Sequence, residues 1–309
     1  MSLQSVVEGE VAFAAPNSGK PCNTWYKVVG DLHGSSFPPL IALHGGPGAG
    51  HDYLASLNDL FEQHGIPLVF YDQIGCGRST HLREKMGDDS FWTFDLFIAE
   101  LDNLVDHLKL RAKGFYVLGQ SWGGMLAGMY AARCPKGLKK VIIGSSPCSF
   151  PLFVEGGKHL RAELPPEIRK ALEEGDRDGN HETPEYKNAS EIFYKRHVCR
   201  IDPMPLPVQQ TFNNLKEDPT SYNTMQGPSE LVVTGNLKDW DGSEEAKKIE
   251  VDTLLINGRF DEVTELCVEP WFRSIPRVKW VIFESSSHMP HWEERERFMQ
   301  LVATFLTLY

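Results

Sequence analysis

A serine in a turn of small residues is the first candidate for chemistry in this sequence. Ser121 lies in the segment GQSWG at 119–123, which follows the apolar run 115–118 and precedes a helix-like stretch at 125–132. The pattern G-x-S-x-G is typical of a nucleophile elbow, a sharp strand-to-helix turn that exposes a serine hydroxyl. Small residues flank the serine because strand and helix approach too closely there for a β-carbon. The sequence therefore predicts that Ser121 is a nucleophile.

A serine hydroxyl becomes a good nucleophile only when a histidine takes its proton and a carboxylate orients that histidine. Asp261 comes a few residues after the apolar run 253–256, and His288 comes in the same way after the run 280–283. Taken separately, Asp261 suits a turn and His288 suits a helix cap. Together they give the chain order Ser, acid, His of the α/β-hydrolase arrangement. We therefore predict a catalytic triad of Ser121, Asp261 and His288.

A glycine-rich segment, HGGPG at 44–48, follows an earlier apolar run. Acyl transfer needs N–H donors aimed at the oxyanion of its tetrahedral intermediate, and glycines let a backbone approach a ligand closely. We expect the N–H groups of Gly46 and Trp122 to form this oxyanion hole. The alternative is a phosphate cradle, which the missing lysine and Ser/Thr of a P-loop argue against.

The segment His288-Met289-Pro290-His291 has a spacing that invites comparison with a metal-binding pair. Pro290 disrupts the regular helix that would present both imidazoles on one face, and no cluster of further ligands supports the pair. We expect no metal and no cofactor.

Six short apolar runs, each continuous rather than alternating, would position these residues. Continuous hydrophobicity is typical of parallel strands that are covered on both faces. Helical patterns lie between them, including one at 94–108 with Thr93 as its N-cap and a last one at 298–306. The sequence predicts an α/β fold, with a mostly parallel central sheet flanked by helices. The runs lie at 39–43, 67–71, 115–118, 140–143, 253–256 and 280–283.

The segment 148–250 breaks this alternation. It contains a polar stretch, a proline-rich stretch and several helix-compatible pieces. We predict a mainly helical cap inserted over the carboxyl edge of the sheet, where α/β enzymes bind ligands, with residues 1–147 and 251–309 forming the core. The alternative is a partly disordered insertion, which aromatic residues such as Phe193 and Phe212 argue against.

The composition excludes several classes of partner. The formal net charge of -11 argues against nucleic acid or an anionic membrane surface, and no apolar run is long enough to span a membrane. The N-terminus does not resemble a secretory signal, and the six cysteines are scattered, which favours free thiols and a cytoplasmic protein. The oligomeric state is left open.

Three motifs carry a resemblance to a known family. They are HGGPG at 44–48, DQIGCGRS at 72–79 and GQSWGG at 119–124. With these motifs, the chain resembles the proline iminopeptidase family of α/β-hydrolases over nearly its whole length. Those enzymes, together with the related tricorn-interacting aminopeptidases and L-amino acid amidases, remove an N-terminal residue or cleave an amino acid amide. The resemblance implies a small peptide or amino acid amide as substrate and no cofactor.

The resemblance also implies two carboxylates that hold the substrate's free α-ammonium. Glu262 matches one that directly follows the catalytic aspartate, and Glu230 matches one in the cap after the Gly-Pro turn at 227–228. A cation in a partly desolvated pocket needs opposite charge nearby. The alternative for both residues is a solvated glutamate at the surface.

Departures from the family pattern leave the preference for proline open. Strict proline iminopeptidases usually have arginine where Ile74 stands, and a GGSWGS elbow where this chain has Gln120 and Gly124. We predict a serine hydrolase that releases an unblocked N-terminal residue, proline or a small apolar one, through an acyl-enzyme. An esterase or a biosynthetic tailoring hydrolase or cyclase on the same triad is the alternative, and a non-catalytic receptor on the same fold is a third reading.

Overall fold

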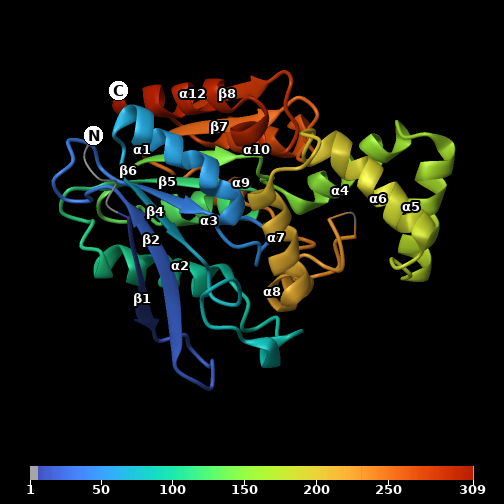
Figure 1. The fold of residues 1–309 in the computed structure, drawn as a ribbon, viewed down its shortest axis with the longest axis horizontal. Coiled ribbons are helices and arrows are strands. Elements are labelled where there is room, and N and C mark those ends of the chain that lie inside the picture. Colours follow the sequence, from blue (N-terminus) through green and yellow to red (C-terminus); the bar gives the residue numbers. More distant parts are fainter. Residues whose placement is uncertain (1–5, 231, 309) are drawn as a thin grey trace.

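An eight-stranded sheet forms the centre of the computed structural model, which describes residues 6–230 and 232–308 (Figure 1). The strands lie in the order β1-β2-β4-β3-β5-β6-β7-β8, and all neighbours from β4 to β8 run parallel. The predicted mostly parallel sheet is confirmed. The strands are β1 (Val6–Phe13), β2 (Cys22–Val29), β3 (Leu40–Leu43), β4 (Leu68–Tyr71), β5 (Phe115–Gln120), β6 (Leu138–Gly144), β7 (Asp252–Gly258) and β8 (Val278–Phe283).

Helices cover both faces of this sheet because the central strands bury side chains on both sides. In β3, Leu40 and Ala42 face a core built with α1 (Asn58–His64) and α12 (Arg295–Thr307). Ile41 and Leu43 face a second core, which is built with α2 (Phe94–His107), α3 (Trp122–Ala131) and α10 (Glu265–Ser274). All four side chains are fully buried, which explains the uninterrupted apolar run in the sequence.

Twelve α-helices and two short 3₁₀ helices lie within the described residues. The predicted N-cap of α2 is confirmed, since the Thr93 side chain accepts a hydrogen bond from the Leu96 N–H. The α-helices are α1 (Asn58–His64), α2 (Phe94–His107), α3 (Trp122–Ala131), α4 (Phe150–Ala162), α5 (Pro166–Asp178), α6 (Pro184–His197), α7 (Leu206–Glu217), α8 (Thr220–Met225), α9 (Ser243–Ala246), α10 (Glu265–Ser274), α11 (Pro290–Glu293) and α12 (Arg295–Thr307); the 3₁₀ helices are η1 (Asp52–Leu57) and η2 (Arg83–Lys85).

The antiparallel pair β1 and β2 was not among the six strands predicted from the sequence. In β1 only Val11 and Phe13 are buried, while most other residues of the strand are exposed. The strand lies at the edge of the sheet, so it lacks the continuous apolar run that marks the central strands. It pairs with β2 from Val6 opposite Val29 to Phe13 opposite Cys22.

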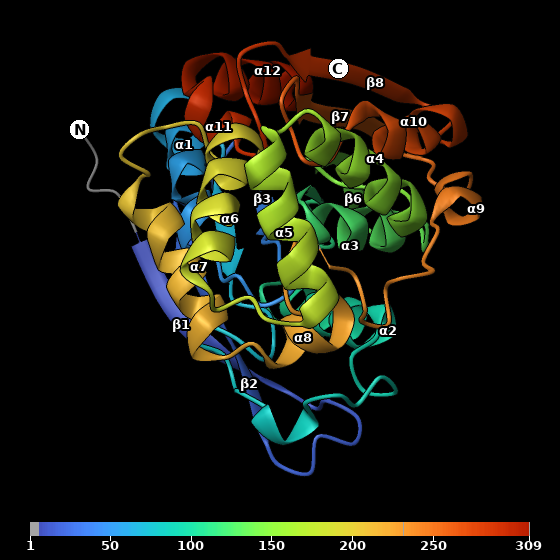
Figure 2. The ribbon, with the colours of Figure 1, turned by 90° about the vertical axis from the view of Figure 1, so that its right-hand side faces the viewer.

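The segment between β6 and β7 carries α4 to α9, in agreement with the predicted mainly helical insertion. Figure 1 shows α5 and α6 projecting together from the body of the molecule, and in Figure 2 these two helices face the viewer. These two helices share a small apolar cluster that includes Leu172, Tyr186 and Phe193. In contrast, α7 is bound to the core, because the Asn214 side chain donates a hydrogen bond of 3.0 Å to the Ala49 carbonyl. The boundaries of the cap as a domain stay a prediction.

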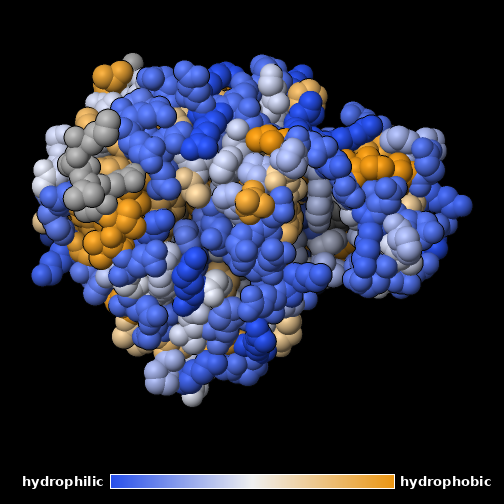
Figure 3. Space-filling view, in the orientation of Figure 1, coloured by the Kyte–Doolittle hydropathy of each residue, from blue (hydrophilic) through white to orange (hydrophobic). Residues whose placement is uncertain are grey.

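The face seen in Figure 3 is mostly hydrophilic, with small separate apolar patches. Among the helices of the described part of the chain, none combines the length and the apolar character that crossing a membrane requires.

Candidate active site

Ser121 lies between the end of β5 and the start of α3, in the turn that the elbow pattern predicts. Its backbone has φ 58° and ψ −126°, a conformation that residues with a side chain rarely adopt. A β-carbon at Gly119 would overlap the Gly123 carbonyl, and one at Gly123 would overlap the Leu43 carbonyl. The flanking glycines are therefore required by the close approach of β5, α3 and β3.

Asp261 and His288 come from the loops after β7 and β8, and the structure brings them into contact. The distance from His288 Nδ1 to Asp261 Oδ1 is 2.7 Å, and both side chains are buried. The Val263 N–H also donates to Asp261 Oδ1, at 2.8 Å. With Nδ1–H donating to this carboxylate, Nε2 is the nitrogen left to exchange a proton. Ser121 and His288 line the same cavity.

The charge of Asp261 decides the protonation of His288. Burial alone disfavours the imidazolium, but the facing carboxylate outweighs it, and with smaller contributions from Glu262 and Glu230 it raises the pKa of His288 to about 9. The histidine is thus a strong base for a proton from the serine.

The HGGPG segment forms a loop against the elbow. A β-carbon at Gly45 would stand 3.0 Å from the Ser121 Cβ, and Gly46 has a φ of 104°, which favours glycine. Gly46 lines the cavity that also holds Ser121. Trp122 is the first residue of α3, so its N–H has no acceptor within the helix and is free to face a ligand. The two expected oxyanion donors thus lie on the two segments that border the serine.

His44 fixes the peptide group that carries one of these donors. Its Nε2 accepts the Gln73 N–H at 2.9 Å, so the proton is assigned to Nδ1, which donates to the Gly45 carbonyl at 3.0 Å. That carbonyl and the Gly46 N–H belong to one planar peptide unit, so holding the first orients the second. Burial lowers the pKa of His44 to about 4, which keeps it neutral.

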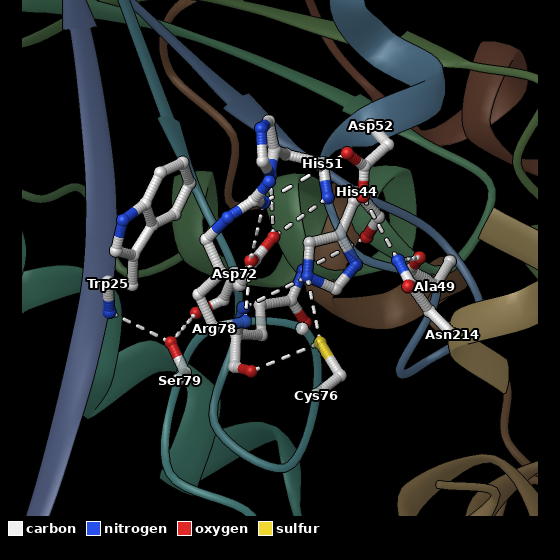
Figure 4. Close-up of polar contacts among 12 residues, drawn as sticks. Trp25, His44, Ala49, His51, Asp52, Asp72, Cys76, Arg78, Ser79 and Asn214 are labelled. Atoms are coloured by element: carbon white, nitrogen blue, oxygen red, sulfur yellow. Dashed lines mark hydrogen bonds and ion pairs between the residues drawn. The ribbon is translucent and has the colours of Figure 1, made fainter. Parts of the chain in front are cut away.

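Gln73 connects this loop to the elbow. Its amide nitrogen donates to the His44 carbonyl at 2.9 Å, and its amide oxygen accepts the Trp122 indole N–H at 2.8 Å. The segment that follows β4 is in turn held by Asp72, which accepts hydrogen bonds from His51 and from the Arg78 N–H (Figure 4). Burial opposes the charge of Asp72, but the hydrogen bond and the charge of His51 prevail and lower its pKa to about 2.

Sequence reasoning did not identify Tyr53 and Gln120 as parts of the site. The Tyr53 hydroxyl accepts the Gly45 N–H at 2.8 Å and donates to Gln120 Oε1 at 2.5 Å. The Gln120 amide then donates to the His288 carbonyl at 3.0 Å. A single chain of hydrogen bonds therefore joins the glycine loop, the elbow and the histidine loop. The only signal in the sequence was the glutamine itself, which departs from the family's GGSWGS elbow.

Glu262 and Glu230 line the cavity that holds Ser121 and His288. Glu262 is only 4% exposed, and its Oε1 lies 3.8 Å from His288 Nε2. Its Oε2 is buried and has no hydrogen-bond partner among the described residues. Glu230 is less buried and accepts a hydrogen bond of 2.7 Å from the Tyr222 hydroxyl.

Burial raises the pKa of both glutamates, and the charge of Glu230 raises that of Glu262 further, whereas His288 opposes this shift. Two carboxylates that line one cavity, with one oxygen unpartnered, form a site that a cation would stabilise. Glu262 is therefore not a solvated glutamate at the surface, which was the alternative for this residue. Within residues 6–230 and 232–308, no group of three or more His, Cys, Asp and Glu side chains is arranged to hold a metal ion.

The α/β-hydrolase fold family matches this chain over residues 38–295. A proline iminopeptidase of Saccharolobus solfataricus is 38% identical over 284 residues, which cover 92% of this chain and 89% of that protein. The chain belongs to the proline iminopeptidase family of α/β-hydrolases. A second member of this family, a proline iminopeptidase of Thermoplasma volcanium, is 37% identical over 267 residues, covering 86% of this chain and 88% of the relative.

Two solved structures are similar to this chain over nearly its whole length. The crystal structure of the proline iminopeptidase of Mycobacterium smegmatis superposes with a TM-score of 0.87 at 37% identity, covering 96% of this chain and 97% of that one. The crystal structure of VinJ has a TM-score of 0.91 at 43% identity and covers 97% of this chain and 98% of that one. The fold class and the family resemblance predicted from the motifs are confirmed.

Proposed function

We propose that this protein is a serine aminopeptidase that releases an unblocked N-terminal residue from a small peptide or an amino acid amide. One observation carries the proposal: the cavity that holds Ser121 and His288 also holds two carboxylates, Glu262 and Glu230. An unpartnered carboxylate oxygen in a buried site is costly unless a cation neutralises it. The α-ammonium of an unblocked residue is such a cation. The relatives of this protein that are named proline iminopeptidase support the same reaction class.

In the proposed reaction, Ser121 Oγ attacks the carbonyl carbon next to the bound α-carbon while His288 Nε2 takes the serine proton. The N–H groups of Gly46 and Trp122 stabilise the oxyanion, and Asp261 stabilises the imidazolium that forms. His288 then gives its proton to the leaving nitrogen, which departs and leaves an aminoacyl ester on the serine. Water, deprotonated by the same histidine, hydrolyses this ester and restores the enzyme.

The two glutamates give the proposed enzyme its requirement for a free amine. With the ammonium between them, both carboxylates are ionised and paired. An N-acetyl group removes the positive charge and leaves these carboxylates buried without a cation, which penalises blocked substrates. This requirement distinguishes an exopeptidase from an esterase or a tailoring hydrolase on the same triad, because the latter enzymes have no need of the glutamates.

We propose the cytoplasm as the location of this protein, as the scattered cysteines of the sequence indicated.

The test compares kcat/KM for aminoacyl p-nitroanilides with a free and with an acetylated amine, for Pro, Ala, Leu and Phe. We expect cleavage of the free series and strong discrimination against the acetylated one. The Ser121→Ala variant should lose activity, and a fluorophosphonate should label only the wild-type serine. Equal rates for both series would contradict the proposal. Labelling without cleavage of either series would favour the esterase or tailoring enzyme, and no labelling of the folded protein would favour a receptor.

A further inference from the structure

A second cavity, called the side cavity here, also borders the glutamate pair. Glu230 and Glu262 line both this side cavity and the cavity that holds Ser121 and His288, which is called the triad cavity below. The triad cavity has a volume of about 40 Å³. The side cavity has a volume of about 200 Å³. The side cavity is therefore the larger of the two spaces that border the glutamates.

The walls of the side cavity are mainly apolar. Phe153 and Val154 come from α4, Phe193 comes from α6, and Val233 comes from the loop after α8. Phe153 and Phe193 are buried. The charged side chains in the lining other than the glutamates already have acidic partners: Lys158 pairs with Glu155, and Arg161 pairs with Asp176. The free surface of the cavity therefore suits a hydrocarbon group rather than a charged one.

The covalent structure of the substrate indicates which part of it reaches this cavity. In an N-terminal residue, the ammonium and the side chain are bonded to the same α-carbon. If the glutamates hold the ammonium, the α-carbon lies beside them, and its side chain starts at the border of the side cavity. The leaving nitrogen is bonded to the carbonyl carbon instead, and it must lie near His288 Nε2 to receive a proton. The leaving group therefore belongs on the other side of the carbonyl.

We propose that the side cavity is the specificity pocket for the side chain of the released residue, and that it favours apolar side chains larger than that of alanine, such as those of Leu, Met and Phe. This inference rests on the proposed aminopeptidase function and identifies its substrate class. The sequence alone did not rank the apolar residues of the insertion. In the structure, Phe153 and Phe193 line the pocket, whereas Phe212 lines the triad cavity and Trp240 packs against Phe94.

Gly157 provides a direct test of the pocket. It lies in α4 and lines the side cavity, and a β-carbon added there would meet no atom within 4 Å. A larger side chain at this position should fill the pocket without disturbing its walls, and replacing a helical glycine does not weaken the helix. The matched control is His159→Leu, which adds the same side chain at an exposed position of α4 that does not line the cavity.

The experiment measures kcat/KM of wild type, Gly157→Leu and His159→Leu on free aminoacyl p-nitroanilides of Ala, Leu, Met and Phe. We expect wild type to prefer Leu, Met and Phe over Ala by roughly tenfold or more, as an apolar pocket discriminates by size. In Gly157→Leu the ratio of Leu to Ala should fall at least tenfold, while His159→Leu should keep the wild-type ratio. Thermal unfolding and fluorophosphonate labelling check that both variants fold.

A parallel series keeps leucine as the N-terminal residue and varies the leaving group: amide, p-nitroanilide and a dipeptide. If Gly157→Leu changes the dependence on the leaving group but not the preference for the N-terminal residue, the cavity holds the leaving part and the inference is overturned. An unchanged profile in both series would overturn it as well. Failure of wild type to cleave any free aminoacyl substrate would be a different result, since it would contradict the aminopeptidase function itself.

Discussion

Glu262→Gln is the substitution that bears most directly on how this protein recognises its substrate. The change keeps the shape of a side chain that is 4% exposed but removes its negative charge. If the carboxylate pairs with a substrate ammonium, the loss resembles the breaking of a buried ion pair by removal of one partner. Such changes cost about 3–5 kcal/mol, which corresponds to roughly a hundredfold to a few thousandfold in an equilibrium or rate ratio. Because Glu230 remains, we expect the lower end, about a hundredfold in kcat/KM.

The assay compares free and N-acetylated leucyl p-nitroanilide on wild type, Glu262→Gln and Glu185→Gln, an exposed glutamate of α6 that serves as the control. The free substrate should lose about a hundredfold, and the acetylated one should lose little, so the discrimination between them should collapse. The variant should be at least as stable to heat as wild type, since an unpartnered buried carboxylate oxygen is removed. An equal loss for both substrates would refute the reasoning, because it would place the effect on catalysis rather than on the amine.

Three further predictions concern the base, the oxyanion loop and a buried acid. His288 must be neutral to accept the serine proton. With a pKa of about 9 in the free enzyme, kcat/KM should therefore fall as the pH decreases below that value. The acid limb of kcat should lie at lower pH, because a bound ammonium offsets the charges of the glutamates, and pH profiles of both constants check this. His44→Leu removes the hydrogen bond that orients the Gly46 N–H. In steady-state kinetics, this variant should have a kcat lowered about 10- to 100-fold with little change in KM. A change confined to KM would contradict the role assigned to His44. Burial raises the pKa of Glu100 to about 8. Between the unfolded pKa near 4.5 and pH 8, this carboxyl stays protonated in the folded state but ionises in the unfolded state, so stability is lost as the pH rises. Glu100→Gln should reduce the loss of stability between pH 5 and pH 8, as measured by urea unfolding, and an unchanged pH dependence would contradict this prediction.

Much of the fold could be predicted because its determinants are local in the sequence. The elbow around Ser121 is specified by adjacent glycines, and the central strands are marked by continuous apolar runs. The loops that carry Asp261 and His288 follow two of those runs directly. In each case a short segment contains both the structural signal and the functional side chain.

The parts that could not be predicted depend on contacts between distant segments. Tyr53 meets Gln120 across 67 positions, and Gln120 meets the His288 carbonyl across 168. No local pattern distinguishes such a tyrosine or glutamine from one at the surface. Similarly, Phe193 and Phe212 both lie on helices of the insertion, and only the packing of those helices decides that they line different cavities.

Asp261 and Glu262 are neighbours in one short loop, and this adjacency sets a scale for the substrate. Asp261 holds the imidazole that must reach the leaving nitrogen, while Glu262 is proposed to hold the ammonium, and the backbone between them is fixed by the bond from the Glu262 N–H to the His197 carbonyl. The separation between the amine site and the reacting carbonyl is therefore built into two consecutive residues. A β-amino acid, with one more methylene between nitrogen and carbonyl, does not match that separation. The loop would thus select substrates with an N-terminal α-amino acid over those with a longer homologue.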